Sequence, residues 1–200
     1  MLSRPALFAV FLAVLAWSAA APHDYPTWAL ETAPAVIGAG ILVATRRSFP
    51  LTDLACVLAL LHAIVLCVGG HYTYAMVPLF DRLRAWTGGR NDYDRLGHLF
   101  QGFVPAILAR EVLLRRSPLR PGKWLFFLVL CVCMAISAFY ELIEWRVAVF
   151  AGAGADAFLG TQGDPWDTQW DMACALIGAL AAQLSLSRLH DRQLRALPSS

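Results

Sequence analysis

The feature that most limits how this chain can fold is a series of six apolar stretches that together occupy almost its whole length. Few charges interrupt them, because Asp, Glu, Lys and Arg make up 15% of the 200 residues, whereas an ordinary soluble domain has about 25%. Each stretch approaches the roughly 20 apolar residues that a helix needs to cross a bilayer with its backbone hydrogen bonds satisfied internally. The sequence therefore predicts an all-α, polytopic transmembrane helical bundle with about six spans.

The predicted spans leave room for a single integral membrane domain over residues 1–200 and for no soluble domain. A short amphipathic helix is also predicted near residues 77–86, where Leu79, Phe80 and Leu83 share one helical stripe that would lie on the outer interface. The spans are predicted near residues 5–22, 28–45, 53–70, 94–115, 123–150 and 167–187.

Basic residues gather at alternate ends of the predicted spans. The loops 23–27 and 151–166 contain no Lys or Arg, and the positive-inside rule then places both termini in the cytoplasm. Arg82, Arg84 and Arg90, in the loop after the third span, are the exception to this pattern. The basic residues on the predicted cytoplasmic side are Arg4, Arg46, Arg47, Arg115, Arg116, Arg120, Lys123, Arg188, Arg192 and Arg195.

The first apolar stretch has two interpretations. Arg4, the apolar run after it and the small residues before Pro22 are also typical of a secretory signal peptide, whose cleavage would leave five spans. The run is long enough to span the membrane if Trp17 to Ala21 are included, so a retained helix is the favoured interpretation of residues 1–21. The other spans keep their orientation in either case.

The charge total argues against a nucleic-acid partner. The net charge is +2, and no basic run is paired with exposed aromatic residues. The expected partners are the lipid bilayer and a lipid or other polar head group. Rings near the outer interface are predicted to form an anchoring belt, because one end of each ring is apolar and the other polar. This belt consists of Trp28, Trp86, Trp145, Trp166, Trp170, Tyr72, Tyr74 and Tyr93.

A polar stripe marks the helix predicted from residue 94. Asp94, His98 and Gln101 are four and then three residues apart, so on a helix they form one line that runs inward from its outer end. His71, at the outer end of the third span, belongs to the same layer. Ionisable residues are costly in a bilayer and usually pair or bind something, so this stripe indicates more than an anchor.

Carboxylates mark the outer ends of the last two predicted spans. Glu141 and Glu144 are three residues apart and lie several residues inside the span 123–150. Asp167 and Asp171 share a face at the start of the following span. The three polar segments are therefore predicted to lie in one layer at the outer face of the bundle.

Part of this layer also has a structural explanation. Asp94, Asp164 and Asp167 fit the starts of helices, where carboxylates cap free backbone N–H groups. Arg95 or Arg146 would serve as the partner of a neighbouring carboxylate in a structural ion pair. The residues that lie too deep for capping are His98, Gln101, Glu141, Glu144 and Asp171. The structural and functional interpretations of the cluster both stay open.

The functional interpretation is a site for a cation. Carboxylates with an imidazole suit a divalent ion such as Mg²⁺, Mn²⁺ or Zn²⁺, although the spacing does not identify the metal. Such an ion would polarise a phosphoryl oxygen of an envelope lipid or phosphate, with His98 or Glu141 as acid or base. The predicted metal ligands are Asp94, His98, Glu141 and Asp171, and the further binding positions are Gln101, Glu144, Asp167 and His71.

Two other functions compete with this one. A structural or assembly protein would need only paired charges in its interior. A small transporter would need polar residues through the whole membrane, and the predicted cytoplasmic halves of the spans are almost wholly apolar. Arg110 and Glu111, near the inner end of the fourth span, are explained by snorkelling to the interface. The sequence leaves the substrate and the oligomeric state undetermined.

Four strings of the sequence resemble a known family. In order they are HYTYAMVP, YDRLGHLFQGFVPAILARE, SAFYELIEW and GDPWDTQWDM. They resemble the YjdF-like family of bacterial inner-membrane proteins, a domain of unknown function, and the resemblance runs from about the second span to the end of the sixth. It implies a multi-pass protein of the bacterial inner membrane and leaves the activity open.

The chain is also more faintly similar to the VanZ-like membrane family. That family has Asp and His at one helix entry, an acidic residue on the next helix and Asp near the start of a last one. The corresponding positions here are Asp94, His98, Glu141 and Asp171. The Asn that commonly follows the last Asp in that family is absent, since Cys174 and Ala175 stand there.

Overall fold

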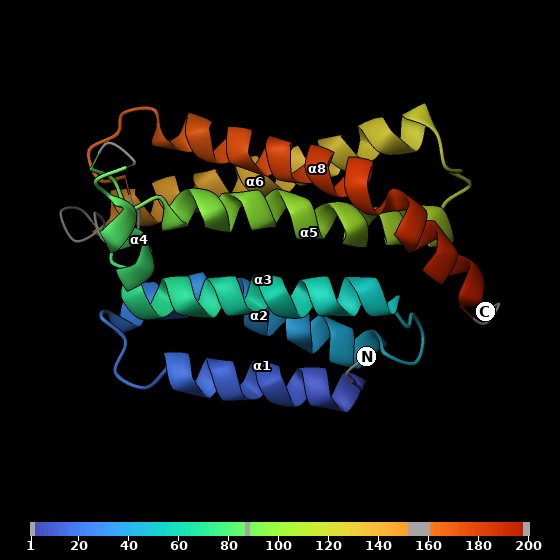
Figure 1. Cartoon of the computed structure of the whole chain (residues 1–200), viewed down its shortest axis with the longest axis horizontal. Coiled ribbons are helices and arrows are strands. Elements are labelled where there is room, and N and C mark those ends of the chain that lie inside the picture. The colour runs from blue at the N-terminus through green and yellow to red at the C-terminus, as the bar shows by residue number, and fades with distance from the viewer. Residues whose placement is uncertain (1–2, 87–88, 152–160, 198–200) are drawn as a thin grey trace.

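The computed structural model is a bundle of helices that run alongside one another (Figure 1), and it describes residues 3–86, 89–151 and 161–197. Every regular element in these ranges is a helix, which confirms the predicted all-α class. The helices are α1 (Arg4–Ser18), α2 (Tyr25–Thr45), α3 (Asp53–Tyr72), α4 (Pro78–Leu83), α5 (Tyr93–Arg116), α6 (Lys123–Ala151) and α8 (Asp167–Ala196).

Four of the described helices, α2, α3, α6 and α8, are long and apolar enough to cross a membrane. This supports the prediction of a helical membrane protein. The other two predicted spans, α1 and α5, are not both long enough and apolar enough to be counted among these four helices. Helix α1 is apolar but has 15 residues, or about 22 Å of helix against a hydrocarbon core of about 30 Å. Helix α5 has 24 residues, but its polar residues, Asp94 and Glu111 among them, lower its hydropathy.

The helices form two groups that meet along α3 and α5. Helices α1 and α2 pack against α3, while α6 and α8 pack against α5, and α3 contacts α5. In Figure 1, α1 begins and α8 ends at the same end of the bundle, and α4 lies at the opposite end. Helix α5 therefore occupies the middle of the bundle, with neighbours from both groups.

Helices α5 and α8 approach each other closely at two glycines. A Cβ atom at Gly102 or at Gly178 would overlap the backbone of the other helix. Small residues permit this kind of close approach between membrane helices. The contact fixes the relative position of the N-terminal turns of α5 and α8, which carry His98 and Asp171.

A helix is present where the interfacial helix was predicted, but it is shorter than residues 77–86, because α4 covers Pro78–Leu83. Its apolar stripe is divided between two environments. The side chains of Leu79 and Leu83 are exposed, whereas the ring of Phe80 lies edge-on to that of Tyr93, with 5.2 Å between the ring centroids. Helix α4 thus covers the end of the bundle with one side and keeps apolar side chains exposed on the other.

An apolar core separates the two polar ends of the bundle. Val104, Ala106 and Ile107 of α5 are buried and belong to a hydrophobic cluster with residues of α3, α6 and α8. Along α5 these residues lie between Gln101, near the end with α4, and Glu111, near the other end. The polar residues of α5 are therefore divided between two separate regions.

The predicted snorkelling of Arg110 and Glu111 is wrong, because both side chains are buried. The backbone N–H of Thr52 donates to Glu111 Oε1 over 3.0 Å, and Nε2 of His190 lies 3.0 Å from Glu111 Oε2. The physical reason is the length of α8, which continues to Ala196 instead of ending near residue 187 and so covers this end of α5.

Candidate functional site

His98 stands at the centre of a buried polar cluster near the α4 end of the bundle. Its Nε2 atom lies 3.6 Å from Asp94 Oδ1 and 4.0 Å from Asp171 Oδ2. The three side chains are 8%, 4% and 1% exposed for Asp94, His98 and Asp171. One ligand atom from each lies within 4.8 Å of the others, which is a spacing that could hold a metal ion. The structure thus brings together predicted residues from α5 and α8.

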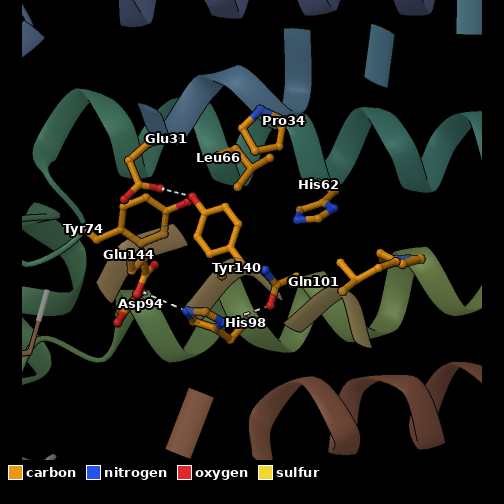
Figure 2. A pocket seen from close by; sticks show the side chains of 13 residues that line it. Glu31, Pro34, His62, Leu66, Tyr74, Asp94, His98, Gln101, Tyr140 and Glu144 are labelled. Carbon is orange, nitrogen blue, oxygen red and sulfur yellow. Dashed lines mark hydrogen bonds and ion pairs between the residues drawn. The ribbon is translucent and has the colours of Figure 1, made fainter. Parts of the chain in front are cut away.

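Gln101 orients the ring of His98. Its Oε1 atom lies 3.0 Å from His98 Nδ1, as Figure 2 shows. A carbonyl oxygen can only accept, so Nδ1 donates its hydrogen to Gln101, and Nε2 is the ring nitrogen directed at the carboxylates of Asp94 and Asp171. Metal-binding histidines commonly donate their second N–H to an oxygen in this way. The pair therefore presents His98 as a ligand.

Two carboxylate oxygens of the cluster have unused hydrogen-bonding capacity. Asp171 Oδ1 and Glu141 Oε1 are buried and have no hydrogen-bond partner among the described residues. Glu141 Oε1 lies 3.8 Å from His98 Nδ1, too far for a hydrogen bond. Because a buried acceptor without a partner is costly, such oxygens call for a ligand or an ion.

Arg90 and Arg95 place positive charge at the outer edge of the cluster. Arg90 lies 3.5 Å from a carboxylate oxygen of Asp94 and 2.5 Å from one of Asp167. Arg95, which the sequence offered as the partner of a neighbouring carboxylate, lies 3.1 Å from Asp92 and 3.1 Å from Asp164. Asp167 is therefore held mainly by an arginine, and it lies at the rim of the cluster.

Asp94 and Asp167 lie in the first turns of α5 and α8, as predicted, but neither helix start has a side-chain cap hydrogen bond. Asp164 was the predicted start of the last helix, but α8 begins three residues later, and Asp164 accepts a hydrogen bond from the N–H of Trp166 in the preceding turn. Arg146 lies 4.3 Å from the ring centroid of Phe150. Within the described part of the chain it forms no ion pair with Glu141.

A cavity of about 190 Å³ adjoins the cluster. It lies where the two groups of helices meet, and Figure 2 shows polar side chains pointing into it from both. Glu31 of α2 and His62 of α3 line one side, and Asp94, Tyr140 and Glu144 of α5 and α6 line the other. The predicted residue Glu144 thus belongs to the cavity wall and is not one of the three residues whose ligand atoms converge.

Glu31 is a site residue that the sequence interpretation missed. It is 5% exposed and accepts a hydrogen bond of 3.2 Å from the hydroxyl of Tyr140, across the contact between the two groups of helices. A signal for it existed, because Glu31 is a carboxylate inside the apolar span 28–45, as Glu141 is inside its own span.

Two residues assigned to the aromatic belt lie elsewhere. Tyr74 and Tyr93 are 5% and 6% exposed, and Tyr74 lines the cavity. The prediction of an interfacial anchor is wrong for both, since the two rings pack against each other, with 5.6 Å between their centroids, inside an apolar cluster. Trp86 and Trp166, by contrast, are largely exposed.

His71 lies apart from the cluster with which the sequence grouped it. Its Nδ1 atom is 3.0 Å from the carbonyl oxygen of Ser18, and its ring stacks on that of Trp17 at 4.7 Å between centroids. These contacts join α3 to α1. The binding role predicted for His71 has no counterpart in this geometry.

The family described as "Predicted membrane protein (DUF2238)" matches residues 4–192. The chain belongs to this family. Over 183 residues it is 54% identical to a protein described as inner membrane protein YjdF of Escherichia coli (strain K12), which covers 91% of this chain and 88% of that protein. No solved structure matches the chain.

The family and this relative confirm the resemblance carried by the four sequence strings. They also confirm the predicted location, a multi-pass protein of the bacterial inner membrane. The matched residues include the whole polar cluster and every residue that lines the cavity. The chain is therefore an integral membrane protein, and the cluster lies within the part that defines its family.

Proposed function

We propose that this membrane protein binds a divalent cation through Asp94, His98 and Asp171 and uses it to hold a polar head group. The observation that carries this proposal is the convergence of three buried ligand atoms within 4.8 Å, next to carboxylate oxygens that lack a hydrogen-bond partner. Glu141, predicted as a fourth ligand, lies outside this set, because its Oε1 atom is beside Nδ1 of His98 and not beside Nε2. Oxygen and imidazole nitrogen donors suit Mg²⁺, Mn²⁺ or Zn²⁺.

The proposed ion would also support chemistry on a phosphate. A bound cation polarises a phosphoryl oxygen and lowers the pKa of bound water. Of the two residues predicted as acid or base, Glu141 fits that role better, because Nδ1 of His98 is occupied by Gln101 and its Nε2 faces the ion. The enzyme hypothesis is therefore a metal-dependent reaction on an envelope lipid or phosphate with Glu141 as the base.

The proposed site faces outward in a domain of six spans over residues 1–200 with cytoplasmic termini. Two observations support this topology. Helix α1 begins and α8 ends at the same end of the bundle, and the cluster lies at the other end (Figure 1). Arg4, Arg192 and Arg195 belong to the end with the termini, as the positive-inside rule requires of a cytoplasmic face.

The structural and transport alternatives have less support. Arg90 pairs with Asp94 and Asp167, and Arg95 with Asp92 and Asp164, but Asp171 Oδ1 and Glu141 Oε1 are buried without a hydrogen-bond partner among the described residues. A transporter needs a polar path through the bundle. The buried apolar residues around Ile107 separate the cluster from the polar residues near Glu111.

Metal binding by the purified protein tests the proposal. Titration of Mn²⁺ into the protein in nanodiscs, followed by electron paramagnetic resonance, is expected to show about one bound ion per chain. Asp171→Asn and His98→Ala should each abolish it. Asp53→Asn, which changes an exposed carboxylate at the other end of the bundle, should bind as the native protein does.

Two results would overturn the proposal. One is that the native protein binds none of Mn²⁺, Mg²⁺ and Zn²⁺. The other is that folded Asp171→Asn and His98→Ala proteins, with melting temperatures near that of the native protein, retain the ion. In that case the cluster is a hydrogen-bonded network and the structural alternative holds.

A further inference from the structure

The cavity beside the proposed cation site is strongly acidic. Glu31, Asp94 and Glu144 all line it, and no described residue that lines it is Lys or Arg. Asp94 has Arg90 nearby, whereas Glu31 and Glu144 form no ion pair within the described part of the chain. These two side chains are only 5% and 8% exposed. Buried carboxylates of this kind need a cation or protons to offset their charge.

Polar groups in the cavity wall are short of partners. Glu144 is more than nine-tenths buried, and among the described residues it has neither a hydrogen bond nor an ion pair. Nε2 of His62 is buried and also lacks a hydrogen-bond partner within the described residues. Glu31 accepts hydrogen bonds from the hydroxyls of Tyr140 and Tyr74 and has no cationic partner among the described residues. The wall therefore offers hydrogen-bond acceptors to whatever the cavity holds, and buried groups of this kind are costly to leave unmatched.

Two prolines lie inside helices that line the cavity. Pro34 lies inside α2 and Pro105 inside α5, and both line the cavity. A proline within a helix has no N–H for the carbonyl four residues earlier, so the carbonyls of Leu30 and Gln101 lose their helical partners. In membrane helices such carbonyls are tolerated where they face a cavity or another polar group. Of these two residues Gln101 lines the cavity, so its carbonyl is the acceptor that this effect adds near the site, whereas Leu30 is exposed.

We propose that this cavity binds the ammonium group of an aminoalkyl phosphate whose phosphate is held at the cation site. This inference rests on the proposed function. Asp94 and His98 belong both to the cation cluster and to the cavity wall, so one ligand can reach both. A volume of about 190 Å³ accommodates an ammonium group and its neighbouring carbons, since a water molecule takes about 30 Å³.

The ligand class follows from the donors and acceptors. An ammonium group has three N–H donors and no acceptor, which matches the three carboxyl groups of Glu31, Asp94 and Glu144 in a wall that is otherwise largely apolar, and charge-assisted hydrogen bonds of this kind are strong. The rings of Tyr74 and Tyr140 add faces that attract a cation. Both a phosphatidylethanolamine head group and free O-phosphoethanolamine present this chemistry.

Calorimetry with two matched ligands tests the ammonium site. The protein is loaded with Mn²⁺ in phosphatidylglycerol nanodiscs and titrated with O-phosphoethanolamine or with ethyl phosphate, which lacks the amine. O-phosphoethanolamine should bind about tenfold more tightly, the value of one good charge-assisted hydrogen bond. Glu31→Gln and Glu144→Gln should each remove most of that preference while keeping the affinities for Mn²⁺ and ethyl phosphate. Asp53→Asn should keep the preference.

The outcomes separate this inference from the function on which it rests. If Mn²⁺ and ethyl phosphate bind but the amine brings no gain, the carboxylates of the cavity are neutral acids and the ammonium site is wrong, while the cation site stands. If Mn²⁺ does not bind, the proposed function fails. A preference that persists in both glutamine variants also overturns the ammonium site, since it would then arise elsewhere.

Competition distinguishes the two sources of the ligand. If the site takes a lipid, short-chain phosphatidylethanolamine should displace bound O-phosphoethanolamine at a lower concentration than added unlabelled O-phosphoethanolamine does. The order reverses if it takes the soluble compound. Short-chain phosphatidylglycerol, which has the phosphate but no amine, is the control, and displacement by it as strong as that by phosphatidylethanolamine contradicts the inference.

Discussion

His190 of α8 lies with its Nε2 atom 3.0 Å from Glu111 Oε2 of α5, and both side chains are completely buried. Arg110 lies 3.0 Å from the other ring nitrogen, so Nδ1 accepts and Nε2 donates to the carboxylate. The hydroxyl of Thr52, at the start of α3, donates to the same carboxylate oxygen over 2.7 Å. One carboxylate thus joins three helices at the end of the bundle opposite the candidate site.

Replacing this carboxylate should destabilise the protein strongly. Glu111→Leu keeps a similar volume but leaves the donors of His190 and Thr52 buried and unmatched, which is expected to cost about 3–5 kcal/mol. Unfolding in mixed micelles measures the change. Asp53→Asn, which removes an exposed contact of 4.0 Å with Arg4, is the control and should cost under about 1 kcal/mol. Equal losses in the two variants would contradict the role of Glu111.

The two glycines at the α5–α8 contact should not tolerate a methyl group. Gly102→Ala and Gly178→Ala place a Cβ against backbone atoms of the facing helix. This overpacking is expected to lower the free energy of unfolding by about 1–3 kcal/mol. Gly38→Ala and Gly40→Ala are matched controls in α2, because their Cβ atoms would meet nothing within 4 Å. These two should be neutral or slightly stabilising, as alanine favours a helix. Melting temperatures that fall alike in all four would show that the close contact is unimportant.

Much of the helical fold was predictable because the signal is local. A backbone in hydrocarbon must bond to itself, so an apolar run of sufficient length is a helix, and the spans predicted at 53–70 and 123–150 agree closely with Asp53–Tyr72 and Lys123–Ala151. Helix α8 was predicted to end near residue 187 because its sequence becomes polar there. It continues because that polar segment packs over Glu111, which is a tertiary contact.

The site was predictable to the extent that it depends on helical periodicity. Asp94, His98 and Gln101 share a face by spacing alone, and the hydrogen bond between the last two follows from that spacing. The approach of Asp171 depends on the close packing of α5 and α8, and that of Glu31 on how the two groups of helices meet. Both contacts depend on how separate helices pack, which no spacing within one helix records. The sequence suggested Asp171 because it is an acidic residue near the start of its helix, and it missed Glu31.

Gln101 should affect metal binding without contacting the ion. Gln101→Leu removes the acceptor of the His98 Nδ1 hydrogen and frees the ring to turn or change tautomer, so the affinity for Mn²⁺ is expected to fall by about 10- to 100-fold. Gln101→Glu restores an acceptor at the same reach and should retain most of the affinity. Mn²⁺ titration under the same conditions compares the two. If Gln101→Leu binds Mn²⁺ as the native protein does, His98 is not held as a ligand by this bond.

The start of α2 should give the protein a pH-dependent stability that is separate from the site. The backbone N–H of Thr27 donates to Asp24 Oδ2 over 2.8 Å, and hydrogen bonds from the side chain and backbone of Thr27 lower the pKa of Asp24 below its ordinary value. A carboxyl with a lowered pKa in the folded state stabilises the fold above its unfolded pKa of about 3.9 and loses that contribution as the pH falls through the folded pKa.

Asp24→Ala is therefore expected to lower stability near neutral pH by about 1 kcal/mol, the usual value of a helix cap. Its difference from the native protein should shrink as the pH drops below about 4, where the native carboxyl becomes protonated. Asp24→Asn keeps an acceptor that does not titrate, so its stability should lie near that of the native protein at neutral pH. Melting temperatures of the three proteins across this pH range provide the measurement. A difference between native and Asp24→Ala protein that stays constant into acid would show that the carboxylate charge contributes nothing to this cap.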